Sequence, residues 1–358
     1  MPYNADDIQV IEESLRNDPK RNSVPDSEDA APSQDDVSTE EKDSVEYATD
    51  YGARPPRSHR AAKRARRWGR VKSRAYDKAP DRFKNASDIQ VRFRTGFVYI
   101  SLTILGVVIN DLTTMILLAA TAGICASEFY YMLRADAKLP NEVLGVLGAM
   151  AYPVCVYFFG LHGTIYVTFV LVLALIIWYV YWMRARIADV GVSLIGAIYT
   201  GFLISGILII RQSIDDDFTA AIVMLLLFLS VWTNDIFAYL IGRKFGKHKL
   251  APRTSPKKSW EGFFAGLVAS AFFWCLMCFV PGVNMDIPTA IVFGLICGCM
   301  CVVGDLAESR IKRNVGVKDS GTIMPGHGGL FDRCDSLFLG SCTACLLMAF
   351  GHVLPIVL

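Results

Sequence analysis

Long apolar stretches alternate with short polar ones from about residue 95 to the end of this 358-residue chain, whereas the first 90 residues are strongly polar. Each apolar stretch comes close to the ~20 residues that a helix needs to cross a hydrocarbon layer of ~30 Å. The sequence therefore predicts an all-α polytopic membrane protein with about nine transmembrane helices, at 95–112, 113–133, 141–160, 163–183, 187–210, 218–241, 262–281, 287–304 and 334–357.

Basic residues are distributed unevenly between the connections of these predicted helices. Every second connection is basic, above all 242–259 and 305–333, whereas the others carry only Arg211, followed by the three aspartates at 215–217. Lys and Arg are enriched in the cytoplasmic loops of membrane proteins. We therefore predict a multi-pass protein of the cell membrane, with a cytoplasmic N-terminus, an extracytoplasmic C-terminus and the polar site at the cytoplasmic face.

The polar N-terminal region divides by charge. Residues 1–50 contain 15 acidic and 4 basic residues, and residues 54–74 contain ten Lys and Arg and no acid. The first composition is typical of disorder, and the second suits contact with anionic membrane lipids; nucleic-acid binding is the rival interpretation, which we do not favour. We predict a disordered acidic tail at 1–53, a basic juxtamembrane segment at 54–92 and the membrane domain that carries the site at 93–358.

The ten cysteines do not follow a metal-binding pattern, because nearly all of them fall within the apolar spans. There, cysteine acts as a small packing residue. Cys334 differs, since it lies between Arg333 and Asp335, but its spacing to other residues fits no zinc motif.

The densest polar block, residues 304–336, lies between two predicted spans and combines carboxylates, cations and a glycine-rich turn. A site that holds a divalent metal against a polyphosphate requires these groups together. Asp305 is expected to close one span, and Asp332 and Asp335 to open the next on one helix face. We predict these three as catalytic metal ligands; N-terminal capping is the alternative for the last two.

The cations of this block are candidates for phosphate contacts. Lys318 and His327 complete the predicted catalytic set, because His327 lies between glycines where the backbone can approach a phosphate closely. The candidate substrate-binding cations in the block are Lys312, Arg313 and Arg333.

A second polar block covers residues 232–262. Asp235 lies inside an apolar span, where an ionisable group is costly and usually functional; pairing with a cation that only stabilises packing is the alternative. The following Ser255-Pro-Lys-Lys258 run is interrupted by prolines that exclude a helix interior. We predict that Asp235 and this ordered loop, with Ser255, Lys257 and Lys258, bind a triphosphate substrate; plain cytoplasmic charge is the simpler alternative.

Both blocks resemble the phosphatidate cytidylyltransferase (CDP-diacylglycerol synthase) family. The similar residues are Ser309, Lys312-Arg313, Lys318-Asp319, Pro325, His327-Gly328-Gly329, Asp332-Arg333 and Asp335, together with Asp235, Ala238-Tyr239, Gly242, Gly246-Lys247, Lys249-Leu250 and Ser255 to Lys258. Weaker similarities occur at 94–96 and at Glu128. Asn234 departs from the pattern, because a serine is expected there.

The resemblance implies the reaction of CTP with phosphatidate to give CDP-diacylglycerol and pyrophosphate, with Mg²⁺ as cofactor. The prediction allows for two metal ions and for a homodimer. A CTP-dependent lipid or polyprenol kinase would share the metal and phosphate groups and is the main alternative. A transporter is the second, although its charges would be expected near the bilayer midplane in repeated halves.

Overall fold

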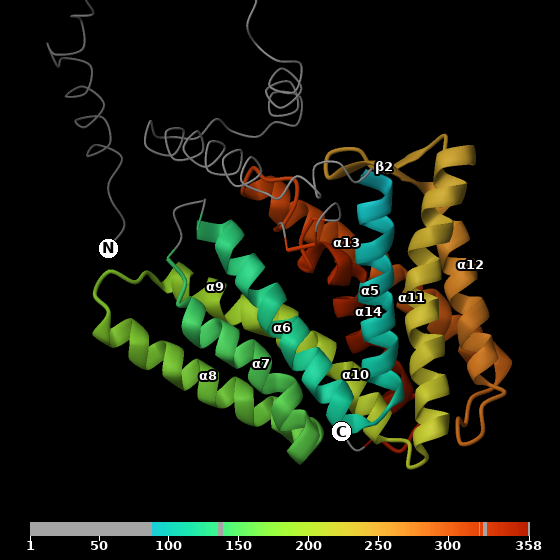
Figure 1. Ribbon diagram of the computed structural model, residues 1–358, viewed down its shortest axis with the longest axis horizontal. Coiled ribbons are helices and arrows are strands. Elements are labelled where there is room, and N and C mark those ends of the chain that lie inside the picture. Colours follow the sequence, from blue (N-terminus) through green and yellow to red (C-terminus); the bar gives the residue numbers. More distant parts are fainter. Residues whose placement is uncertain (1–87, 135–138, 322, 325–327, 357–358) are drawn as a thin grey trace, which may run out of the picture. The chain divides into compact units, whose positions relative to one another are not determined.

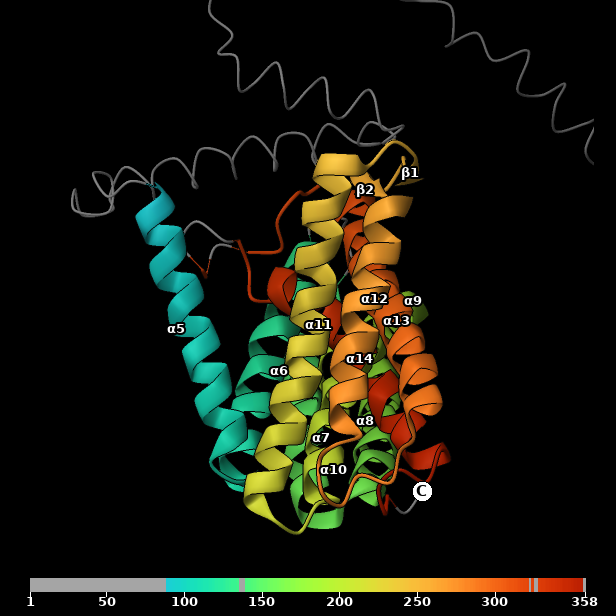
Figure 2. The same ribbon diagram turned by 90° about the vertical axis from the view of Figure 1, so that its right-hand side faces the viewer.

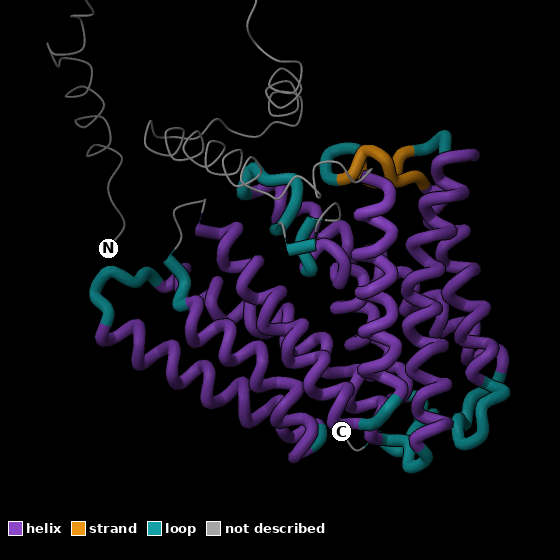
Figure 3. Tube along the Cα trace, viewed as in Figure 1, coloured by secondary structure: helices purple, strands orange, loops and turns teal. Residues whose placement is uncertain are grey.

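The computed structural model describes residues 88–134, 139–321, 323–324 and 328–356, with side chains from Arg94 onward. The predicted tail at 1–53, most of the basic segment at 54–92, and His327 lie outside the described residues. Helices make up nearly all of the described part (Figure 1, Figure 3). They are α5 (Asp88–Val108), α6 (Asp111–Arg134), α7 (Glu142–Phe159), α8 (Leu161–Tyr181), α9 (Ile187–Ala197), the π-helical turn η2 (Ile198–Phe202), α10 (Leu203–Gln212), α11 (Asp217–Phe245), α12 (Trp260–Met277), α13 (Ile287–Asn314) and α14 (Phe331–Phe350).

Eight helical segments within the described residues are long and apolar enough to cross a membrane, with α9, η2 and α10 forming one of them. The predicted first span corresponds to a shorter apolar helix, Arg94–Val108, within α5. The prediction of a polytopic helical membrane protein is therefore confirmed, and its count of nine is approximate.

Several helices begin where a side chain can satisfy free backbone N–H groups. Asn141, Asp216 and Ser259 each accept a hydrogen bond from the amide three residues later, at the starts of α7, α11 and α12. Such caps typically stabilise a helix by about 1 kcal/mol. They explain why the polar connections end sharply at these positions.

The Ser-Pro-Lys-Lys run forms a strand, an element that the sequence analysis did not predict. Strand β1 (Lys249–Ala251) pairs antiparallel with β2 (Ser255–Ser259). Pro256 is tolerated in β2 because both strands of a two-stranded sheet are edge strands. The hairpin connects α11 to α12, which pack closely: a Cβ on Gly262 would lie 2.3 Å from the carbonyl oxygen of Ala238.

Helix α13 continues ten residues beyond the predicted end of its span at residue 304. The segment after Gly304 is polar, but it contains good helix formers and an i, i+4 ion pair between Glu308 and Lys312. The helix ends just before Gly316, which has a φ of 73°. The extension places Asp305, Glu308 and Lys312 on one helix face.

The hairpin, the α13–α14 connection and the start of α5 lie at one end of the helix bundle, and the C-terminus lies at the other (Figure 1, Figure 2). At this second end the backbone N–H of Asn284 donates to the carbonyl oxygen of Val353, 3.1 Å away. The predicted basic connections 242–259 and 305–333 are thus on the same side of the protein. All ten cysteines are free, and five of them are buried.

Candidate active site

Three carboxylates from two helices meet at the polar end of the bundle. Ligand oxygens of Asp305 and Glu308 on α13 and of Asp335 on α14 all lie within 4.8 Å of one another. The helices approach closely here, because a Cβ on Gly304 would lie 2.5 Å from the carbonyl oxygen of Asp335. Oxygen ligands in this number and spacing suit a hard divalent cation.

Glu308 is the most buried member of this acidic cluster. Its side chain has no exposed surface, and Lys312 Nζ lies 2.8 Å from its Oε2 as an ion-pair partner. Among the described residues, Lys312 is the only ion-pair partner of this carboxylate, and it is shared with Asp332. A buried carboxylate in this state is costly unless further positive charge is supplied, which supports a cation site at the cluster.

Lys258 connects the second polar block to the acidic cluster. Its Nζ lies 2.6 Å from Asp305 Oδ2, and Ser309 Oγ donates to the other oxygen of that carboxylate at 3.3 Å. The two blocks, separated by more than forty residues in the chain, therefore form one site. The structure also distinguishes Lys258 from Lys257, which is exposed.

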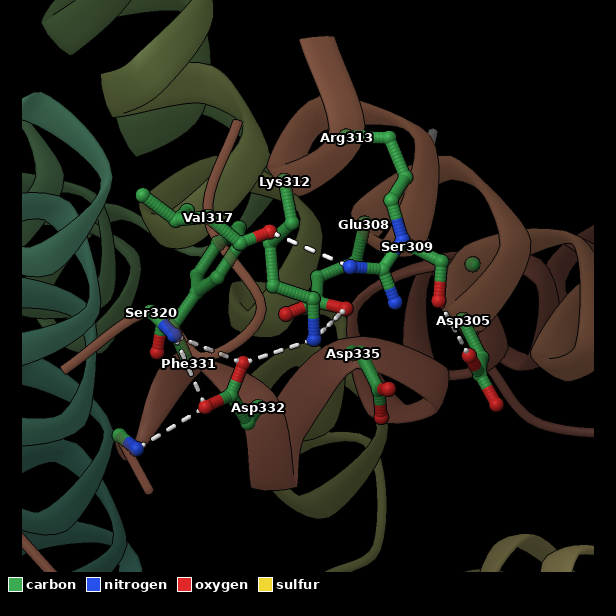
Figure 4. A network of polar contacts seen from close by, with 12 residues as sticks. Asp305, Glu308, Ser309, Lys312, Arg313, Val317, Ser320, Phe331, Asp332 and Asp335 are labelled. Carbon is green, nitrogen blue, oxygen red and sulfur yellow. Dashed lines mark hydrogen bonds and ion pairs between the residues drawn. The ribbon is translucent and has the colours of Figure 1, made fainter. Parts of the chain in front are cut away.

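Asp332 lies beside this cluster, but its carboxylate is occupied by hydrogen bonds from within the protein (Figure 4). Its carboxylate accepts from the backbone N–H groups of Ser320 and Gly329, both at 3.0 Å, and from Lys312 Nζ at 2.9 Å. Gly328, with a φ of 88°, forms the turn that directs the Gly329 amide toward it. The metal-ligand role predicted for Asp332 stays a prediction; in the structure it anchors the connection between α13 and α14.

Asp235 on α11 faces the same region. Ser336 Oγ donates to its Oδ1 at 3.3 Å, and Asp305, Lys258 and Arg333 are close enough to interact with it electrostatically. The structure therefore brings Asp235 toward the predicted site.

The remaining candidates are more peripheral. Lys318 and Arg333 are exposed, Arg313 donates to the carbonyl oxygen of Val317 at 3.4 Å, and Ser255 pairs with Ala251 in the hairpin. Lys312 is only 12% exposed and is shared between two carboxylates, so it is less free for a phosphate than the exposed cations.

Two carboxylates near the site were not among the predicted site residues. Glu308 lies three residues after Asp305 and four before Lys312. If the predicted helix had been extended beyond residue 304, this spacing would have placed Glu308 on the same face as both residues. Glu128, on α6, is buried and contacts the α13–α14 connection. In the sequence, Glu128 showed only a weak similarity to the pattern of the family.

These features define a polytopic helical membrane protein with a carboxylate-rich site and a basic hairpin at one end. A family model described as "Cytidylyltransferase family" matches residues 90–351, and the chain belongs to that family.

Curated relatives of the chain include two bacterial proteins named phosphatidate cytidylyltransferase. The one from Staphylococcus haemolyticus is 48% identical over 109 residues, which are 30% of this chain and 42% of the relative. The one from Brucella abortus is 39% identical over 161 residues, 44% of this chain and 56% of the relative. The chain thus aligns with about half the length of these curated relatives.

Proposed function

We propose that the protein is a phosphatidate cytidylyltransferase that converts CTP and phosphatidate to CDP-diacylglycerol and pyrophosphate. The observation that carries the proposal is the contact of Lys258 with Asp305, which joins the Ser-Pro-Lys-Lys hairpin to the acidic cluster. The names of the relatives support the same activity.

The chemistry requires positive charge more than it requires a base. A phosphate oxygen of phosphatidate attacks the α-phosphorus of CTP, and the bond from that phosphorus to the pyrophosphate oxygen breaks. The attacking oxygen is already anionic at neutral pH, so no proton has to be removed from it. The protein must instead reduce the repulsion between two anions and stabilise charge on the leaving group.

Asp305, Glu308 and Asp335 would hold a divalent cation, and we propose Mg²⁺, as one or two ions. When bound, Mg²⁺ supplies charge that neutralises the phosphates. Lys258, next to the cluster, is placed to hold a phosphate oxygen at the same point. The exposed cations Lys257, Lys318 and Arg333 would surround the rest of the triphosphate with positive charge; the homodimer stays a prediction.

The position of the label in CTP tests this proposal against its main alternative. Purified protein is incubated in detergent with phosphatidate, Mg²⁺ and CTP labelled at either the α- or the γ-phosphate. A cytidylyltransferase transfers the α label to lipid and releases the γ label as pyrophosphate. Transfer of the γ label to lipid would instead show a kinase, and absence of any turnover would contradict both enzymes.

We also propose that the polar end faces the cytoplasm, with a cytoplasmic N-terminus and an extracytoplasmic C-terminus in the cell membrane. Its support is the concentration of cations at that end. A cysteine at Lys249 should react with an impermeant thiol reagent only from the cytoplasmic side, and one at Asn284 only from outside. The wild-type chain, with its own ten cysteines, provides the background; labelling of both positions from the same side would refute the topology.

A further inference from the structure

A buried carboxylate on α6 binds both the α13–α14 connection and the start of α14. Glu128 is 4% exposed, and its Oε2 accepts hydrogen bonds from Ser320 Oγ at 3.1 Å and from the Phe331 amide at 2.9 Å. Ser320 lies in the α13–α14 connection, six residues after the end of α13, and Phe331 is the first residue of α14. One oxygen of a side chain on α6 therefore holds these two residues close together.

Two glycines make room for this carboxylate. A Cβ on Gly321 would lie 2.3 Å from Glu128 Oε1, and one on Gly329 would lie 2.4 Å from Oε2. The neighbouring Phe129 ring packs against Phe331, with ring centroids 5.9 Å apart. Helix α6 is thus fitted to the connection by polar and apolar contacts together.

Ser320 forms hydrogen bonds with two carboxylates, and these bonds connect Glu128 to the acidic cluster. Its hydroxyl donates to Glu128 and its backbone N–H donates to Asp332, whose carboxylate also binds Lys312 Nζ. Lys312 in turn pairs with Glu308 of the cluster. A continuous series of polar contacts therefore runs from α6 to the candidate metal ligands (Figure 4 shows the part from Ser320 onward).

We propose that Glu128 is a positioning residue, which acts through Ser320 and Phe331 to hold Ser320 and the start of α14 together around Asp332 and so to fix Lys312 against Glu308. Its role requires a hydrogen-bond acceptor and not a negative charge. The expected effect on kcat rests on the proposed function. The expected effect on hydrogen–deuterium exchange rests on the hydrogen bonds alone.

The substitutions Glu128→Gln and Glu128→Leu separate these requirements, because they are similar in size to glutamate. Glutamine keeps an oxygen that both donors can reach, and leucine keeps none. We expect Glu128→Leu to lower kcat about tenfold or more, with a smaller change in the KM for CTP, because displacement of positioned groups mainly affects the transition state. Glu128→Gln should stay within about threefold of the wild-type kcat, since both hydrogen bonds are kept.

Hydrogen–deuterium exchange of the peptide covering residues 317–334 gives a readout that does not depend on activity. The amides of Ser320 and Phe331 should exchange faster in Glu128→Leu and at the wild-type rate in Glu128→Gln. Glu142→Gln is the matched control, because Glu142 pairs with Arg134 at the end of the same helix α6 and has no contact with the connection among the described residues. It should change neither readout.

Ser320→Ala completes a double-mutant cycle. If Glu128 acts through Ser320, the combined Glu128→Leu and Ser320→Ala variant should lose little more kcat than Glu128→Leu alone. If Glu128→Leu does not accumulate in the membrane, Ser320→Ala decides: lower kcat with faster exchange supports the proposal, and wild-type behaviour in both overturns it.

Two further results would overturn the proposal. Glu128→Leu with wild-type kcat and exchange would show that the contacts position nothing. Glu128→Gln as inactive as Glu128→Leu, with normal exchange, would show that the charge itself is needed. A wild-type protein that does not use CTP and phosphatidate would refute the proposed function instead, and the exchange measurements would still test the role of Glu128.

Discussion

The two ends of the helix bundle both hold buried charge, but they balance it differently. At the end away from the site, Arg211 is fully buried, with Asp111 and Asp217 at 2.9 and 2.8 Å from its guanidinium. These two carboxylates are 39% and 71% exposed. At the site end the buried groups are instead carboxylates, with Glu308 at 0% and Asp332 at 5% exposed and a single lysine, Lys312, between them.

The difference indicates a structural ion cluster at the far end and a candidate cation site at the other. Arg211 joins the end of α10 to the starts of α6 and α11, and its single positive charge is offset by two carboxylates that still reach water. At the site end, Lys258 forms an ion pair with Asp305, and Lys312 forms ion pairs with Glu308 and Asp332. Asp335 and Asp235 form no ion pair among the described residues. Such a surplus of negative charge is costly, and a cation bound at the cluster would compensate it.

The largest effect should follow from removal of a cluster carboxylate. Asp335→Asn and Asp305→Asn are each expected to lower kcat by about a hundredfold or more, since a lost metal ligand weakens the charge stabilisation of the transition state. The measurement is CTP turnover over a range of Mg²⁺ concentrations, and residual activity should need more Mg²⁺. Asp286→Asn, at the other end of the same helix and exposed, is the control. Normal turnover in either cluster variant would contradict the assignment of the acidic cluster as a cation site.

A smaller effect is expected for the lysine that joins the two polar blocks. Lys258→Met should lower kcat about tenfold or more, because the ammonium group at Asp305 is lost, and Lys258→Arg should recover part of it. Lys257→Met, at the exposed neighbouring position, should cost about twofold, as expected for a screened charge. Equal losses at both positions would mean that the hairpin contributes general positive charge and no specific contact.

The smallest effect on turnover should come from the far end. Arg211→Met is expected to lower the free energy of unfolding by about 1–3 kcal/mol, because charge-assisted hydrogen bonds are lost while the two carboxylates still reach water. Thermal unfolding in detergent measures this loss. The kcat per folded molecule should stay within about twofold. A loss of kcat as large as that of Lys258→Met would show that this end is coupled to the chemistry.

Much of the fold followed from the apolar pattern, because crossing a bilayer imposes length and composition on each helix. The convergence of Asp305 and Asp335 was predicted for the same reason, since both border apolar spans. Glu308 was not, because hydropathy detects where a helix leaves the hydrocarbon and not where its hydrogen bonding ends. The strands at 249–251 and 255–259 were missed because short polar strands carry no apolar alternation.

The contacts of Asp332 and Glu128 could not be predicted from sequence patterns at all. Asp332 accepts from backbone amides of a connection whose path is set by the packing of α13 and α14. Glu128 meets Ser320 and Phe331 from 192 and 203 residues away in the chain. Local periodicity carries no information about either contact.

The π-helical turn η2 has a consequence for how this chain tolerates insertions and deletions. A π turn holds one more residue than an α turn, and here it includes Tyr199, whose hydroxyl donates to the carbonyl oxygen of Gly304 at 3.3 Å. The ring of Tyr199 also packs between Phe331 and Phe338 of α14. Deletion of one residue from 198–202 would convert the turn to regular α-helix and leave α9 and α10 in nearly the same relative orientation, whereas deletion of one residue from α9 or α10 would rotate the residues beyond it by about 100°. Hydropathy would hardly change in either case. Packing, and not hydropathy, therefore sets the register of this span, and the π turn is the place where a change of one residue can be absorbed.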